Sequence, residues 1–157
     1  MAEVGIVRAS WRDARTLGRL DRAWFPPADA FGWLNYLSLL IWPGGVALKA
    51  VAGERIVGFV AGDPRRRQGF AIIVTLGVDP AWRRRGIGEQ LMRECEARLD
   101  LLRFQLQVRK SNAAAIRLYR RLGYTILGDL PHYYGDGEDG YLMEKAKTPG
   151  FSEKPGV

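Results

Sequence analysis

The sequence has only one cysteine and one histidine, and each scarcity excludes a kind of site. Cys95 alone can form neither a disulfide within the chain nor a cysteine-based metal site. His132 alone removes the usual zinc ligand sets and argues against a serine–histidine–aspartate triad. We therefore expect no metal centre in this protein.

Long apolar runs are also absent. The longest one, from about Leu37 to Leu48, is interrupted by proline and glycine at positions 43–45 and is too short to span a bilayer. The first residues include Glu3 and lack the apolar core of a signal peptide. We expect a cytoplasmic protein that does not engage a membrane.

The length and composition fit one ordinary folded domain. Of the 157 residues, 47% are hydrophobic and 26% are charged, which suffices to bury a core without disulfides. The chain shows no internal repeat and no linker. The prediction is a single domain over residues 1–146, followed by a flexible tail over residues 147–157.

The net charge of +7 comes mostly from arginine and suits an anionic partner, without choosing between nucleic acid, lipid and a phosphorylated cofactor. Two arginine clusters occur, at 65–67 and 83–85, and only the second lies beside glycines. We assign no function to the first cluster. Exposed aromatics are not expected among the arginines, so no role for nucleic acid is predicted.

Apolar periodicity predicts a mixed α/β protein. Residues 87, 91, 95 and 99 are apolar at a spacing of four, which is typical of one helix face. Further helices are expected at 11–21, at about 29–41, and after a cap at Ser111 or Asn112. Strands are expected at Val4–Arg8, Val46–Val51, Ile56–Gly62, Phe70–Val78, Phe104–Val108, Tyr124–Leu127 and Tyr141–Glu144. This order indicates one sheet with helices on both faces.

The most informative segment, residues 78–88, joins an apolar strand to a helix. It reads Val-Asp-Pro-Ala-Trp-Arg-Arg-Arg-Gly-Ile-Gly. The first turn of a helix has unpaired N–H groups and partial positive charge, and glycines let a diphosphate approach that backbone. The segment is neither a Walker A loop nor a complete dinucleotide-binding motif. It therefore predicts main-chain binding of a phosphorylated ligand.

Two ordered motifs resemble those of the GCN5-related N-acetyltransferases, the GNAT superfamily. Arg83-x-x-Gly86-Ile87-Gly88 is similar to motif A, and the run from Ser111 to Tyr124 is similar to motif B, at the expected spacing. The resemblance covers about residues 46–144. It implies the GNAT fold, a mixed sheet of about six to seven strands with about four helices, and acetyl-CoA as cosubstrate.

The resemblance also implies site residues. The backbone of Leu76, Gly77 and Val78 would contact the pantetheine arm and thioester carbonyl, and Asn112 would also contact pantetheine. Tyr119 would lie near the sulfur as general acid. The diphosphate would be bound by Arg83, Arg84, Arg85, Gly86, Ile87, Gly88 and Glu89.

Within the superfamily, residues 106–112 and 132–141 resemble RimI-like ribosomal-protein alanine acetyltransferases and other N-terminal protein acetyltransferases. This implies a protein or peptide N-terminus as acceptor, a ribosomal protein among the candidates, and a monomer or homodimer. Phe25, Tyr133 and Tyr134 would bind the acceptor. The implied function is acetylation of its α-amine.

The chain departs from that group at one position. Gln107 stands where bacterial relatives carry a glutamate as general base, and a carboxamide cannot accept a proton usefully. His132, a chain of waters or no base at all remain as alternatives. A lysine amine costs about 3 kcal/mol more than an α-amine to deprotonate at neutral pH, so a site without a base favours an α-amine.

Two other functions fit the same fold. An acidic pocket would favour an acetyltransferase for a small amine, such as a polyamine, an aminoglycoside or an amino acid, and Asp136, Glu138 and Asp139 could provide one. A non-catalytic acetyl-CoA sensor would explain the missing base.

Overall fold

The computed structural model describes residues 3–29 and 31–147. Its strands are β1 (Val4–Arg8), β2 (Val46–Ala52), β3 (Arg55–Arg65), β4 (Phe70–Val78), β5 (Arg103–Arg109), β6 (Thr125–Leu130) and β7 (Gly140–Ala146). Its α-helices are α1 (Ala14–Trp24), α2 (Trp33–Ile41), α3 (Ile87–Leu99) and α4 (Ala113–Arg121). Single 3-10 turns are η1 (Trp11–Asp13), η2 (Pro27–Asp29) and η3 (Pro80–Trp82).

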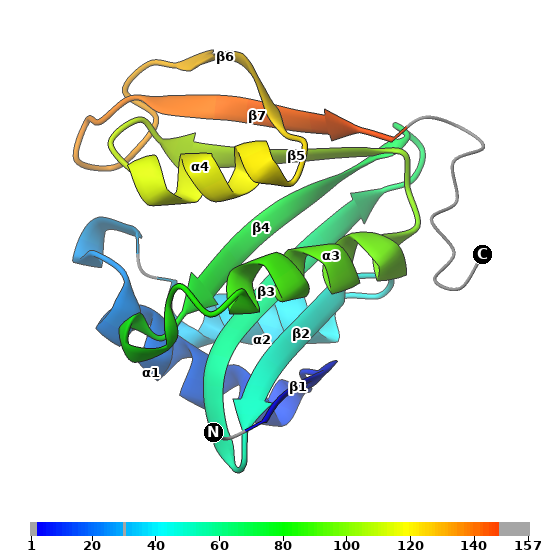
Figure 1. Ribbon diagram of the computed structural model, residues 1–157, viewed down its shortest axis with the longest axis vertical. Helices are drawn as coiled ribbons and strands as arrows, with labels where there is room; N and C mark the ends of the chain where they lie inside the picture. The colour runs from blue at the N-terminus through cyan, green and yellow to red at the C-terminus, as the bar shows by residue number, and fades with distance from the viewer. Residues whose placement is uncertain (1–2, 30, 148–157) are drawn as a thin grey trace.

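The seven strands form one sheet in the order β1-β2-β3-β4-β5-β7-β6. All neighbours are antiparallel except β4 and β5, which are parallel and pair only at Ala71–Phe104 and Ile72–Gln105. Beyond these two pairs the strands diverge, and Figure 1 shows the sheet opening between them, with α3 and α4 on either side of the gap. The predicted mixed α/β sheet is confirmed, and the split between β4 and β5 divides it into two parts.

Apolar side chains cover both faces of the sheet, as predicted. On one face α3 and α4 pack over a large core that includes Leu48, Leu91 and Phe104. On the other face α1 and α2 pack over a smaller core around Tyr36 and Phe59. Because every core residue of α3 recurs at helical spacing, the period in the sequence was enough to orient that helix.

Two element boundaries differ from the prediction. Strand β3 runs on to Arg65, through a proline that was expected to lie in a loop. Strand β2 pairs with β3 only as far as Gly62, so the missing N–H of Pro64 lies where β3 has become an edge strand. Helix α2 begins at Trp33 rather than near Asp29, because Asp29 belongs to the preceding 3-10 turn.

The predicted flexible tail lies, apart from Lys147, outside the described residues. Within the residues that the structure does describe, no helix is long and apolar enough to cross a membrane.

Candidate active site

The gap in the sheet leaves backbone groups of β4 without a strand partner. The backbone N–H of Asp79 donates to the oxygen of Val57 on β3 at 2.9 Å. Since N–H groups of an antiparallel strand alternate in direction, those of Val78 and Leu76 point the other way, toward the gap. The β3–β4 register also shifts between Ala61 and Gly62. This second half of β4 therefore offers main-chain donors to a ligand in the gap.

The N-terminus of α3 lies directly after this strand. Its N-cap is Gly86, whose φ of 78° is left-handed and whose missing side chain supplies no cap. The first intrahelical bond runs from Gln90 N–H to the Gly86 oxygen at 3.0 Å. The N–H groups of residues 87–89 precede it and are free by helix geometry. A Cβ at Gly88 would come within 3.3 Å of Leu118 on α4, so glycine keeps this helix end and α4 close together.

The three arginines of the preceding turn are exposed and have different surroundings. Arg83 donates from Nε to the Val78 oxygen at 3.3 Å. Arg85 lies over the ring of Trp82, 4.6 Å from its centroid. Arg84 has a left-handed φ of 63°, so two left-handed residues flank Arg85. Turns of this kind direct successive N–H groups to one side and favour an anion there.

Helix α4 contributes two of the predicted residues. Asn112 caps the helix, and its side-chain oxygen accepts from Ala115 N–H at 3.2 Å. Its amide nitrogen is the part left for a ligand. Tyr119 is buried, and its hydroxyl has no hydrogen-bond partner among the described residues. Burial, with a smaller effect from the nearby Tyr134, raises the pKa of Tyr119 well above its ordinary value, so the phenol stays protonated.

Together these groups fit an elongated anionic thioester. The helix end and the arginine turn suit a diphosphate, and the free edge of β4 suits amide and carbonyl groups of the arm. A protonated phenol suits a sulfur that gains negative charge. The sequence predicted these residues, and the structure brings them together around one gap.

Phe25, which the sequence predicted to bind the acceptor, packs beside β4. The ring of Phe25 packs edge-on against Phe59, with centroids 6.4 Å apart. A Cβ at Gly77 would lie 3.1 Å from Phe25 and 2.9 Å from Phe59. Glycine at position 77 therefore lets both rings approach β4 where its free edge begins. The sequence predicted Phe25 for the acceptor and Gly77 for the cofactor, and the two are in contact.

Arg109, at the end of β5, joins two loops that are far apart in sequence. Its guanidinium binds Asp29 in the α1–α2 loop through two hydrogen bonds, one of them 2.7 Å long from Nε. It also binds Asp136 at 2.9 Å and Glu138 at 2.7 Å in the β6–β7 hairpin. The ring of Tyr134 lies under it, 4.3 Å from centroid to Cζ. We call these five residues the Arg109 cluster.

The electrostatics of the Arg109 cluster favour its charged, closed form. The pKa of Asp136 is lowered by the backbone N–H of Glu138 and then by Arg109. The pKa of Glu138 is lowered by hydrogen bonds from Ser111 and then Arg109. Burial raises the pKa of Tyr134 to about 12. At neutral pH the carboxylates are therefore charged and the phenol is not.

Sequence reasoning assigned no role to Arg109 or Asp29. Arg109 lies within residues 106–112, which resemble N-terminal acetyltransferases, but nothing in the sequence pairs it with an aspartate 80 positions earlier. The other predicted acceptor residue, Tyr133, is 52% exposed on the hairpin and packs edge-on against Tyr134.

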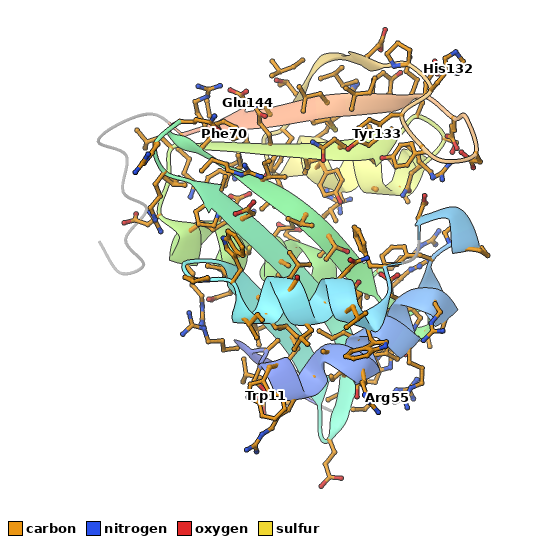
Figure 2. All side chains as sticks on the ribbon, turned by 180° about the vertical axis from the view of Figure 1, so that it is seen from behind. Trp11, Arg55, Phe70, His132, Tyr133 and Glu144 are labelled. Atoms are coloured by element: carbon orange, nitrogen blue, oxygen red, sulfur yellow. The ribbon has the colours of Figure 1, made fainter. Side chains whose placement is uncertain are left out.

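The two candidate bases lie in different places. Gln107 is two residues before Arg109 on β5 and shares its face of the strand, because side chains alternate. His132 lies at the outer edge of the β6–β7 hairpin in Figure 2, with its side chain 84% exposed. Its Nδ1 is 3.2 Å from the Gly137 oxygen. This exposed position argues against His132 as the base.

A cavity of about 400 Å³ lies on the face of the sheet that α1 and α2 cover. It is lined by the α2 side chains Asn35, Ser38 and Leu39, by Phe31 before that helix, and by Val74 at the irregular part of β4. None of the residues predicted from the sequence lines it. In the described part of the chain, histidine, cysteine and carboxylate side chains form no group of three that could hold a metal ion.

Comparisons with known proteins agree with this geometry. Residues 9–124 match the Acetyltransferase (GNAT) family. The N-alpha-acetyltransferase RimI of Mycobacterium tuberculosis is 36% identical over 140 residues, which are 85% of this chain and 86% of that protein. The crystal structure of Ard1 from Thermoplasma volcanium has a TM-score of 0.78 and 28% identity, covering 92% of this chain and 98% of that one.

The ribosomal-protein-S18-alanine N-acetyltransferase of Escherichia coli also superimposes with a TM-score of 0.78, covering 96% of this chain and 98% of that one. At 23% identity that likeness concerns the fold alone. The family match spans most of the chain and contains both motifs found in the sequence. The family match and the Mycobacterium tuberculosis relative agree with the two ordered motifs and with the main-chain donors at the split sheet. This chain therefore belongs to the GNAT acetyltransferase family and is an N-acetyltransferase.

Proposed function

We propose that the protein transfers the acetyl group of acetyl-CoA to the α-amine of a protein or peptide N-terminus. The Arg109 cluster is the observation that carries this proposal. It holds the α1–α2 loop and the β6–β7 hairpin together beside the free edge of β4. Two loops joined in this way form a defined wall for the first residues of a peptide. The Mycobacterium tuberculosis relative, named an N-alpha-acetyltransferase, supports the same acceptor.

In this proposal the chain binds acetyl-CoA mainly through its backbone. The N–H groups of residues 87–89 bind the diphosphate, and exposed Arg83 and Arg84 add charge-assisted bonds. The N–H groups of Leu76 and Val78 bind the arm and the thioester carbonyl, where they stabilise the oxyanion that forms during transfer. Because these donors are fixed in a strand and a helix, they need little rearrangement when the reaction occurs.

The amine attacks the thioester carbonyl in its neutral form. Gln107 cannot take the proton, and the position of His132 is unfavourable. An α-amine with a pKa near 8 is about one tenth neutral at pH 7, whereas a lysine amine is almost wholly charged. The enzyme then contributes chiefly by positioning the two reactants. Tyr119 donates a hydrogen bond, and finally a proton, to the departing sulfur. The attacking nitrogen releases its surplus proton to water, and the Tyr119 phenolate takes a proton back from water, so that the products are the amide and the free thiol of CoA.

The acidic residues of the hairpin count against a small polyamine as acceptor. Asp136 and Glu138 bind Arg109, so their charge is already neutralised in part. Asp139 accepts from the backbone N–H of His132 at 2.9 Å. These carboxylates therefore organise the hairpin and do not form an open acidic pocket.

A panel of acceptors tests the proposal. Short peptides with free N-termini, including N-terminal sequences of ribosomal proteins, are compared with the same peptides blocked at the α-amine but carrying a lysine, and with small amines. We expect acetylation of the free α-amine, located by mass spectrometry. Transfer only to small amines would support the small-amine enzyme. Tight acetyl-CoA binding without any transfer would support the sensor.

The pH dependence tests the absence of a base. For the wild-type enzyme, kcat/KM should rise with pH and level off near the pKa of the peptide amine, about 8. Gln107→Glu should add a general base and raise kcat/KM at pH 6–7 by about tenfold. A wild-type profile that levels off well below the amine pKa would reveal another base and contradict this part of the mechanism.

A further inference from the structure

The outer surface of η1 and α1 carries a row of arginines. Arg12, Arg15, Arg19 and Arg22 follow one another at helical spacing and are all exposed. No ion pair to any of the four occurs in the described part of the chain. Arg12 and Arg15 instead lie over tryptophan rings, at 5.4 and 5.2 Å from the centroids of Trp11 and Trp33.

Nearby acidic groups do not compensate this charge. Asp13 binds Lys49 at 2.9 Å and accepts from the backbone N–H of Ser10. Asp21 is fully buried and binds Tyr36 and the Phe31 backbone. The arginine row is therefore a positively charged surface with no internal counter-charge.

Exposed apolar side chains lie beside the arginines. Leu34 and Ile41, seven residues apart on one side of α2, are 62% and 61% exposed. Trp11, at the start of the arginine row, is 60% exposed. Gly18 of α1 touches Trp33, so α1 and α2 are in direct contact. The exposed apolar side chains of α2 therefore lie next to the arginine row. The arginines, Trp11, Trp33, Leu34 and Ile41 together form what we call the α1–α2 face.

We propose that the α1–α2 face binds the surface of a membrane rich in anionic phospholipid. Arginine side chains bind lipid phosphates, while leucine, isoleucine and tryptophan insert at the level of the headgroups and upper acyl chains. The protein then lies on the membrane without crossing it, and this proposal replaces the expectation from the sequence that no membrane is engaged.

Other occupants fit this surface less well. In a symmetric dimer formed by the face, the arginine row of one copy would lie against that of the other and repel it. Single-stranded RNA would stack on Trp11 and Trp33, but each ring already has an arginine over one side. RNA also gives no reason for exposed Leu34 and Ile41. Exposed arginines beside exposed apolar side chains therefore favour lipid as the ligand.

The location of the face is compatible with catalysis. Figure 2 shows α1 and α2 in front of the sheet, with Trp11 at the outer side of α1. Figure 1 shows the opposite side, where α3 and α4 flank the gap. A protein docked through the α1–α2 face therefore leaves the predicted acetyl-CoA site open to solution. The α1–α2 loop, which carries Asp29, would lie close to the membrane.

Vesicle co-sedimentation of the full chain tests the proposal. Vesicles of phosphatidylcholine alone are compared with vesicles that also contain phosphatidylglycerol. We expect binding only to the anionic vesicles, weakened by salt because arginine–phosphate attraction is screened. Equal binding to both kinds of vesicle, or to neither, would overturn the proposal.

Paired substitutions assign the binding to the face. Arg15→Glu with Arg19→Glu should lower the vesicle partition constant by about fivefold or more for each arginine. Leu34→Ser with Ile41→Ser should lower it by about tenfold, because inserted apolar surface is lost. Arg66→Glu with Arg67→Glu makes the same charge change at another exposed cluster and should have little effect. An equal loss in this control pair would mean that net charge alone drives binding and would overturn the assignment.

Two more measurements keep the result clear. Brominated lipid should quench the tryptophan fluorescence of the wild-type protein, which requires no variant to fold. Acetylation of a soluble peptide should be unchanged in the face variants, so failure here is distinct from failure of the proposed function. Binding of oligouridylate RNA that is lost in the same variants, without vesicle binding, would replace lipid by RNA.

Discussion

The two sides of the proposed active site, a cofactor side and an acceptor side, are built in different ways. The cofactor side, made by the second half of β4, the start of α3 and α4, presents mostly main-chain donors from consecutive stretches of sequence. The acceptor side, made by the α1–α2 loop and the β6–β7 hairpin, is held by side chains that meet at Arg109. The first depends on backbone conformation and the second on ion pairs across the fold. Substitutions should therefore damage the two sides through different kinetic constants.

The largest effect is expected at the backbone of the cofactor side. Gly86→Val places a β-branched residue at a φ of 78°, which such residues rarely adopt. The strain should weaken acetyl-CoA binding by up to about a hundredfold, as measured by calorimetry.

Gly69→Val is the matched control for this change. Gly69 has a φ of 80° and, like Gly86, open space where a Cβ would stand, but it lies in the β3–β4 turn. Gly69→Val should cause a similar backbone strain. The acetyl-CoA affinity of this variant should stay near the wild-type value. Equal losses in the two variants would show that general strain, and not the binding turn, is responsible.

A smaller effect, on the other kinetic constant, is expected for the acceptor side. Arg109→Gln removes the bonds to Asp29, Asp136 and Glu138 and should free the two loops. The KM for peptide should rise by about tenfold, while acetyl-CoA affinity should remain unchanged. Asp29→Asn should have a similar but weaker effect, and the double variant should be less than additive.

Arg103→Gln is the control on the same strand. Arg103 binds Glu144 at the other end of β5, at 2.9 Å, away from the loops. Its removal should leave the peptide KM unchanged. If Arg109→Gln impaired acetyl-CoA binding as strongly as peptide binding, the two sides would not be separable and the comparison would fail.

The smallest of the three effects is expected at the hydroxyl of Tyr119 on α4. Tyr119→Phe removes a group without a hydrogen-bond partner in the described structure, so the fold should be unaffected. The turnover number should fall by about fivefold through loss of a hydrogen bond to the sulfur. Acetyl-CoA affinity should change little.

Tyr141→Phe provides the comparison for Tyr119, because it deletes a hydroxyl on β7 outside the gap. It should keep the wild-type turnover number. A collapse of acetyl-CoA affinity in Tyr119→Phe with an intact turnover per bound complex would remove the acid from the mechanism.

The sequence predicted well the elements that form the proposed cofactor side, because they are made of consecutive residues. Strand β4 has the predicted bounds, and α3 begins at Ile87, after the glycine that caps it. Asn112 was one of two predicted caps, and it is the residue whose side chain caps α4. Local rules of periodicity and capping are sufficient where a site is made by consecutive residues.

Local rules failed at three places where a residue contacts a segment distant in sequence, one of them on the proposed acceptor side. Asp29 was expected to begin a helix, yet its carboxylate binds Arg109 and the helix starts four residues later. Pro64 was expected to lie in a loop, yet it fits the edge of a strand. The arginines of η1 and α1 were not expected to lie near exposed aromatics, yet two of them cover Trp11 and Trp33. Each outcome depends on a neighbour that is distant in sequence.

By itself, the sequence determined the order of helices and strands, the glycine turn that opens α3 at residues 86–88 and the membership of the acetyltransferase family. Those features follow from short-range backbone geometry, which the local residues dictate. Only the tertiary structure decided that Arg109 would join loops from opposite ends of the chain and that arginines and apolar side chains would share one surface. Side-chain ion pairs and surfaces arise when distant segments pack together, and no local pattern encodes that packing.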